Sequence, residues 1–311
     1  MICFAPNAAA DDSKVVKVGV YVNQIRDVDL KSQTFSADLY VWFKWTNPAL
    51  RPDVTFEFMN AFDPSSGAMK KSFKEPLEID PGLFYQVIRY QGRFSSDISL
   101  RSYPFDKQNL KIIFEDNALT TADLIYLLDE KPITINKDLK LPGYQISIPV
   151  IEIRNQQYPT DFGYKISDVV DNYSRASINF DIERPIIPYL LKLIFPILLV
   201  VMVAALAFWI DPFEVEARVG MVVTALLTLV ALQITTNSNL PEVEYLMLID
   251  LLYNLSFAFV LAVMVDVVVT TSLHKKGEES AARIFGNKMR LASFSVYTVA
   301  VILAIMNFQA I

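Results

Sequence analysis

Apolar residues are concentrated after Arg184, and this concentration limits the folds open to the chain more than any other feature. A helix needs about 20 predominantly apolar residues to cross a bilayer. Four stretches meet that length, at about 186–210, 216–237, 243–272 and 284–311. The second part of the chain therefore predicts an all-α bundle of four membrane-spanning helices.

The part before Arg184 is mixed and acidic in composition. Since 53% of the 311 residues are hydrophobic and the mean hydropathy is positive, two soluble domains are excluded. The natural division is a soluble domain at 15–184 followed by a membrane domain at 185–311. Residues 1–14 have a short apolar start without a basic region, and we interpret them as a leader remnant or a tether.

Charge and reactive side chains exclude several classes of function. The net charge of −6 argues against binding to nucleic acid. The single cysteine, Cys3, and the single histidine, His274, argue against a disulfide framework, a zinc site and catalysis by histidine. With no nucleophile and base pair and no phosphate-binding loop, we expect no enzyme and no cofactor.

Strand signals fill the first domain. β-Branched and aromatic residues alternate with other residues in KVVKVGVYVNQI and TFSADLYVWFKWT. Further segments, among them VTFEF, NLKIIF and SRASINFDIE, are separated by turn clusters such as DPSSG. Many short strands predict an all-β, antiparallel, immunoglobulin-like sandwich.

The charges of the connections predict the orientation in the membrane. Lysine and arginine follow the third span, whereas the connection after the second span holds Glu242 and Glu244 and no basic residue. Because basic connections stay cytoplasmic, the sandwich should lie outside the cytoplasm and Glu216 at the inner end of the second span.

The second span contains more polar residues than a lipid-facing helix usually does, and a narrow stripe of residues along one side has a distinct pattern. Residues at every third or fourth position are acidic or small at one end and apolar toward the other. They are Glu216, Gly220, Thr224, Leu227, Ala231, Ile234 and Ser238. The stripe favours a helix that lines an aqueous path, with copies of the same helix from other chains arranged around that path. The alternative is an ordinary buried helix of a membrane bundle. Arg218, about 200° around the helix from Glu216, should face away.

The third span contains two carboxylates, Asp250 and Asp266. Carboxylates inside a membrane are costly and face protein or water. We expect Asp266, near the inner end, to reach cytoplasmic water; the alternative is a proton-sensing role.

Several motifs occur together and in order. They are Tyr103-Pro104-Phe105-Asp106, Arg184 at the domain junction, Pro196 inside the first span and Asn239-Leu240-Pro241 after the second. From about Lys17 to Ile311 the chain resembles the pentameric ligand-gated ion channels, the superfamily of the Cys-loop receptors. Because it has no paired cysteines around the YPFD motif, the chain resembles the prokaryotic branch of this superfamily.

This resemblance implies a homopentamer in a lipid bilayer, in the inner membrane of a bacterium with the N-terminal domain outside. The second helices would ring the pore, with Glu216 at the cytoplasmic mouth as in bacterial relatives that conduct cations. Five carboxylates at a constriction favour monovalent cations, while apolar rings at Leu227, Ala231 and Ile234 close the pore by dewetting.

The resemblance also implies a gating interface between the domains. The expected members are Lys31, Phe105, Asp106, Arg184, Leu240, Pro241 and Glu242. Asp106 and Arg184 should form the central ion pair of this interface. The alternative is that the two charges only neutralise each other at the domain boundary and have no role in gating.

The agonist site departs from the family pattern. The usual Trp-x-Pro stretch lacks its tryptophan, and Asn117 stands where many members place an aromatic residue, so an aromatic cage for an amine is not expected. The candidate ligand residues are Glu115, Asn117, Tyr158, Tyr164 and Tyr173; the tyrosines could equally be surface packing. Carboxylates at Glu115, Asp116 and Asp161 suggest protons or calcium as the agonist or modulator, beside a small organic molecule.

A function of another class remains open at this point. The chain could be a non-conducting membrane receptor whose sandwich senses a ligand for a partner. The acidic and apolar stripe of the second span favours the channel, because a mere anchor has no use for it.

Overall fold

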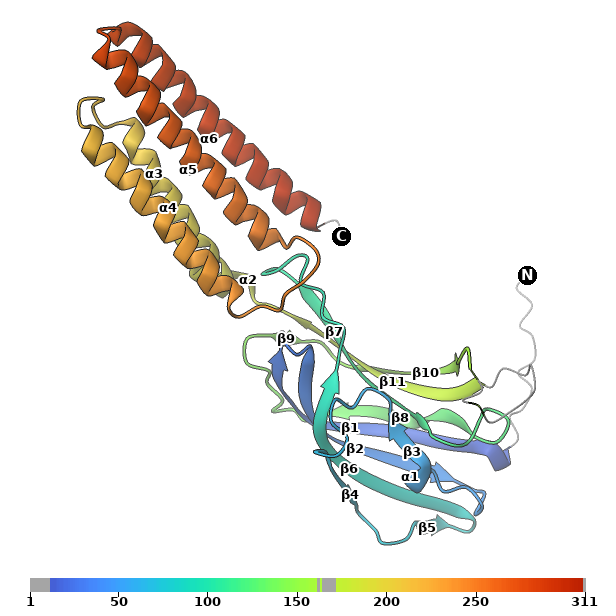
Figure 1. Cartoon of the computed structure of the whole chain (residues 1–311). Helices are drawn as coiled ribbons and strands as arrows, with labels where there is room; N and C mark the ends of the chain where they lie inside the picture. Colours follow the sequence, from blue (N-terminus) through green and yellow to red (C-terminus); the bar gives the residue numbers. More distant parts are fainter. Residues whose placement is uncertain (1–11, 161–162, 164–171, 310–311) are drawn as a thin grey trace, which may run out of the picture. The chain divides into compact units, whose positions relative to one another are not determined.

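The computed structural model describes residues 12–160, 163 and 172–309 of the chain, which divides into two compact units (Figure 1). The first unit contains Lys107–Ile182 and the residues up to Ile98. The second contains Ser99–Asp106 and Glu183–Ile311. The YPFD loop therefore belongs with the helices and not with most of the sandwich.

The first unit is a sandwich of two sheets. The six-stranded sheet has the order β4-β6-β2-β1-β8, with β5 also paired to β6. Its strands are β1 (Val15–Asp29), β2 (Thr34–Trp45), β4 (Ala68–Lys71), β5 (Leu77–Asp80), β6 (Leu83–Ser95) and β8 (Ile125–Ile135). The five-stranded sheet has the order β10-β11-β7-β3, with β9 also paired to β11. Its strands are β3 (Phe56–Phe58), β7 (Lys107–Asp116), β9 (Gln145–Ile146), β10 (Val150–Gln157) and β11 (Asn172–Glu183).

The core of the sandwich follows from the alternation of side chains along the strands. Strand β2 buries Leu39, Val41 and Phe43, while β7 buries Leu110, Ile112 and Phe114. The Phe43 and Phe114 rings meet edge to face with centroids 6.3 Å apart. The fold class predicted from alternation is therefore confirmed.

Two details of the sandwich differ from the prediction. Strands β1 and β8 are parallel, so the sheet is not antiparallel throughout. The predicted segment GYQISIPVIEI is split into β9 and β10, with Pro149 between them, because proline has no amide hydrogen for the ladder.

The second unit contains four helices long and apolar enough to cross a membrane, at Ile186–Phe208, Val215–Asn237, Leu248–Lys275 and Glu279–Phe308. The first span consists of α2 (Ile186–Tyr189), a π-helical turn (Leu190–Ile194), α3 (Phe195–Ala205) and a 3-10 turn (Leu206–Phe208). The others are α4 (Val215–Asn237), α5 (Leu248–Lys275) and α6 (Glu279–Gln309). Helix α5 packs against α3, α4 and α6. A single turn, α1 (Pro52–Thr55), lies in the first unit.

The ends of two helices lie elsewhere than predicted. Helix α5 begins at Leu248 and not near 243, because Met247 is extended and the Leu248 amide donates to the Arg101 carbonyl. Helix α6 begins at Glu279 and not near 284, because Gly277, with a φ of 79°, ends α5 in a tight turn.

Candidate functional site

Helix α4 has one buried face, and most of the rest of its surface is exposed in the single chain. The buried positions are Arg218, Val222, Ala225, Leu229 and Thr236. They recur with the period of an α-helix and mark the side that packs within the unit. The predicted pore positions lie on other sides of the helix.

Every predicted pore position, on α4 and at its C-terminal cap Ser238, is exposed in the single chain. This holds for Glu216, Gly220, Thr224, Leu227, Ala231, Ile234 and Ser238. Leu227 and Ile234 are 64% and 65% exposed, unusual for large apolar side chains unless another surface covers them. The Thr224 hydroxyl donates to the Gly220 carbonyl at 2.7 Å, so its hydrogen is used within the helix. The stripe is free to face further copies or water.

Arg218 points away from the stripe, as predicted. Its side chain is 2% exposed, and Nη2 lies 2.9 Å from Oδ2 of Asp266 on α5. Nη1 donates to the Thr270 hydroxyl at 2.9 Å, and Nε donates to the Ala207 carbonyl at 3.0 Å.

The prediction that Asp266 reaches cytoplasmic water is wrong. Asp266 is 1% exposed, because the Arg218 guanidinium on the neighbouring helix binds and covers its carboxylate. Asp250, at the other end of α5, accepts the Met247 amide at 3.1 Å and so caps the start of that helix.

The predicted junction pair is present in the second unit. Nε of Arg184 donates to Oδ1 of Asp106 at 2.8 Å, with side chains 4% and 2% exposed. Nη1 of Arg184 also donates to the Tyr189 hydroxyl at 2.9 Å. The guanidinium stacks over the rings of Tyr103 and Tyr189, both with centroids at 5.1 Å. Arg184 thus links the YPFD loop to the start of the first span.

The loop after α4 contacts the YPFD segment through residues that the sequence did not single out. The Leu100 amide donates to the Tyr245 hydroxyl at 3.0 Å. The Arg101 guanidinium lies 4.6 Å from the Tyr245 ring centroid, and the Arg101 carbonyl accepts the Leu248 amide at 2.8 Å. These three contacts connect the second and third spans to the loop that carries Asp106.

The other predicted junction residues differ in burial. Leu240 is buried, Pro241 and Phe105 are half-buried, and Glu242 is exposed. Lys31 is exposed in the turn after β1 and belongs to the first unit. Its place at the junction stays a prediction.

Three of the candidate ligand residues gather on the five-stranded sheet around a cation that the sequence analysis missed. Arg175 on β11 forms a short ion pair with Glu115 on β7, and its Nη2 donates to the Tyr158 hydroxyl at 2.8 Å. That hydroxyl in turn donates to Oε2 of Glu115 at 3.0 Å. The Tyr158 and Tyr173 rings meet edge to face with centroids 5.6 Å apart.

This group of Glu115, Tyr158, Tyr173 and Arg175, the Arg175 cluster, is held together by contacts among its members. Burial, and then the hydrogen bond to Glu115, raise the pKa of Tyr158, so the phenol stays a neutral donor. Strand alternation could have identified Arg175, because it lies two residues after Tyr173 on the same face. Tyr164 lies outside the described residues.

Asn117 and Asp116 do not join the Arg175 cluster. Asn117 is exposed and its amide donates to the Thr55 carbonyl at 2.8 Å. Oδ1 of Asp116 accepts the Ala118 and Leu119 amides at 3.0 and 2.8 Å, and Oδ2 accepts the Thr55 hydroxyl.

The proposed calcium ligands are therefore committed elsewhere, as far as the structure describes them. Glu115 faces Arg175 and Asp116 faces its own turn, since neighbours on a strand point to opposite sides. Within residues 12–160, 163 and 172–309, no three acidic, histidine or cysteine side chains come together as a metal site. The third predicted ligand, Asp161, lies outside that range.

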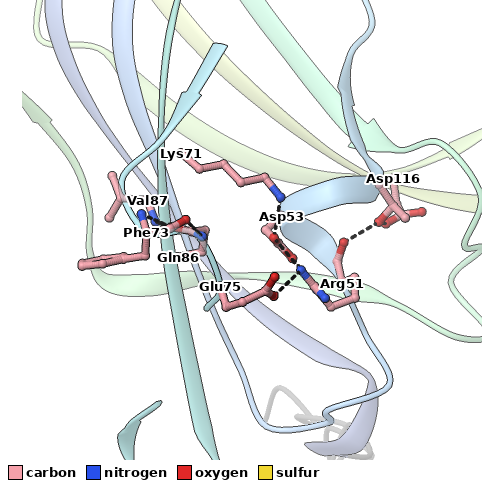
Figure 2. A network of polar contacts seen from close by, with 9 residues as sticks. Arg51, Asp53, Lys71, Phe73, Glu75, Gln86, Val87 and Asp116 are labelled. Carbon is pink, nitrogen blue, oxygen red and sulfur yellow. Dashed lines mark hydrogen bonds and ion pairs between the residues drawn. The ribbon is translucent and has the colours of Figure 1, made fainter. Parts of the chain in front are cut away.

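A polar network occupies the stretch that lacks the usual tryptophan (Figure 2). Asp53 is fully buried, and its carboxylate accepts from Arg51 Nε at 3.0 Å and Lys71 Nζ at 2.7 Å. Arg51 also reaches Glu75 at 3.3 Å. Burial opposes the charge of Asp53, but these donors outweigh it and hold its pKa below the usual range. The network anchors α1 to the sheet and is structural.

A shallow hollow lies on the six-stranded sheet and was not predicted. It is lined by Trp42, Lys44, Ile79 and Tyr85. The Trp42 indole donates to Asp129 at 2.8 Å, and Lys44 lies 2.8 Å from the same carboxylate. Gly19 is required beneath it, because a Cβ there would collide with the indole ring.

Comparison with known proteins agrees with this architecture. Residues 193–296 match the family model described as the neurotransmitter-gated ion-channel transmembrane region. A proton-gated ion channel of Gloeobacter violaceus is 23% identical over 97% of this chain and 86% of its own length. A glutamate-gated chloride channel of Drosophila melanogaster is 22% identical over 87% of this chain and 62% of its own length.

A third relative matches over a shorter range. A gamma-aminobutyric acid receptor subunit beta-like protein of Drosophila melanogaster is 26% identical over 58% of this chain and 35% of its own length. The chain thus spans less than two thirds of the two insect relatives.

The sandwich, the four apolar helices and these matches are those of a ligand-gated ion channel with a membrane domain and an extracellular domain. These similarities support a channel of the prokaryotic pentameric ligand-gated type.

Proposed function

We propose that the chain forms a homopentameric, cation-selective channel in the bacterial inner membrane, with α4 lining the pore. The observation that carries the proposal is the exposure of the whole stripe from Glu216 to Ser238 on a helix whose opposite side is packed. Exposed leucine and isoleucine alternate with small and hydroxyl residues there, which suits a wetted path more than a lipid surface.

The choice of cations rests on Glu216. It is the acidic residue of the stripe, exposed at the first turn of α4. A ring of carboxylates at a pore mouth attracts cations and repels anions. One relative is named a chloride channel, so similarity to the family alone does not decide between cations and anions. The proposed selectivity for cations therefore depends on the residue at the pore mouth.

We propose protons as the stimulus, with calcium as a modulator to be tested beside them. In the Arg175 cluster the carboxylate of Glu115 already binds Arg175 and Tyr158, so among the described residues it is paired with a cation of the chain itself. A proton on Glu115 would weaken both contacts. A relative that matches 97% of this chain is named a proton-gated ion channel.

The test is to purify the chain in a mild detergent, determine its mass by native mass spectrometry and record currents after reconstitution. A pentamer that conducts cations when the outer pH falls supports the proposal. A dominant monomer or dimer, or a pentamer that conducts under no condition, would instead support a receptor that does not conduct.

A further inference from the structure

The Arg218–Asp266 pair lies behind the pore stripe, near the acidic end of α4. Two of the three groups that hold the guanidinium, Asp266 and Thr270, come from α5. The third, the Ala207 carbonyl, comes from the end of the first span. Arg218 is thus fixed on the packed side of the helix, while Glu216 two positions earlier is exposed.

This placement has an electrostatic consequence for the mouth. Arginine stays protonated in proteins, so each subunit carries a permanent positive charge close to its Glu216. Charges act over longer distances when low-dielectric protein separates them than in water. An uncompensated guanidinium in every subunit would reduce the attraction of the Glu216 ring for cations.

Asp266 provides the opposite charge at 2.9 Å, with both side chains 2% exposed. The other charged groups whose field reaches the pair are Asp211 on one side and Arg290 on the other. Those two have opposite signs, and neither forms an ion pair with Arg218 or Asp266 among the described residues. The compensation of Arg218 therefore depends on Asp266.

We propose that Asp266 is a positioning and selectivity-determining residue that neutralises Arg218, so that Glu216 alone sets the potential at the mouth. The inference rests on the proposed function, because it assumes that α4 lines the pore. It extends the determinants of ion choice to a residue of α5, outside the pore stripe.

The experiment measures reversal potentials across a salt gradient for the parent, Asp266→Asn, Arg218→Gln and the double variant. We expect Asp266→Asn to lower the cation-to-anion permeability ratio by roughly twofold or more, since one positive charge per subunit becomes uncompensated. Arg218→Gln should not lower the ratio, and the double variant should return it to the value of the parent. Asp250→Asn is the matched control, the same change at the other end of α5, and should leave the ratio unchanged.

If the Arg218–Asp266 pair only holds the helix in place, a different result is expected: both single variants lower the cation-to-anion permeability ratio. A lowered ratio in Arg218→Gln, or an unchanged ratio in Asp266→Asn, overturns the proposal. If Asp266→Asn fails to assemble because its guanidinium is buried without a partner, Arg218→Gln and the double variant decide. Ratios at or above that of the parent then support the proposal, and lower ratios overturn it.

Failure of the proposed function is recognised separately. A parent channel that prefers anions rejects the cation-selective reading of Glu216. The differences among the variants still test the role of Asp266.

Discussion

Replacing Arg184 by alanine should destabilise the second unit strongly and impair gating. The Asp106 carboxylate, 2% exposed, would lose a donor at 2.8 Å and remain buried. Breaking a buried ion pair by removing one partner costs about 3–5 kcal/mol. The lost hydrogen bond to Tyr189 adds roughly 1 kcal/mol. We therefore expect a loss of about 4–6 kcal/mol per subunit.

The assay separates stability from gating. Size-exclusion profiles after heating report the fraction of assembled channel, and recordings report opening of the channels that assemble. The double variant Asp106→Asn with Arg184→Gln removes both charges, so it should regain most of the stability. If the pair also transmits gating, this stable double variant will still open poorly.

Two results would refute this reasoning. An Arg184→Ala channel as heat-resistant as the parent would show that the pair contributes little to the unit. A double variant that is stable and opens like the parent would show that the pair only satisfies the domain boundary. Lys137→Gln, at an exposed lysine of the first unit outside the predicted gating interface, is a control for nonspecific loss of charge in the thermal assay.

Three further predictions concern the pore, the sandwich and the stimulus. Leu227→Thr and Ile234→Ser should ease opening by wetting the apolar stripe without changing reversal potentials; channels harder to open would contradict this. Asp53 has a pKa below its unfolded value, so its contribution is present above about pH 4 and is lost as the pH falls through the folded pKa. Asp53→Asn should therefore destabilise the sandwich at pH 7 by about 3 kcal/mol, because Lys71 loses its carboxylate partner and Arg51 keeps only Glu75, and by less near pH 3 in thermal unfolding. Finally, a dose series should show larger responses to protons or calcium than to quaternary amines; strong activation by a choline-like ligand alone would contradict this.

Much of the architecture could be predicted because local patterns encode it. The four spans follow from length and hydropathy, and the two sheets from alternation and turn residues. The stripe on α4 follows from helical periodicity, which also placed Arg218 on the opposite side. Strand β8 escaped detection because charges and Pro132 interrupt its alternation.

The partners of buried charges could not be predicted, because they come from other elements. Nothing near Asp266 in the sequence signals that Arg218 on α4 will reach it, and so water was the natural expectation. The same holds for the partner of Arg175: alternation along β11 places Arg175 on the face of Tyr173, but its contact with Glu115 arises only through the pairing of β11 with β7. The Asp106–Arg184 pair was predicted from the resemblance to a family and not from local pattern.

The most direct test of the account compares the parent and Glu216→Gln in a salt gradient. Neutralising this residue removes one carboxylate per subunit from the exposed end of the stripe while keeping its size and hydrogen bonding. The account predicts that the parent reverses near the cation equilibrium potential and that Glu216→Gln reverses closer to zero. Equal reversal potentials for the two channels, or a parent that prefers chloride, would contradict the claim that α4 presents Glu216 to the permeating ion.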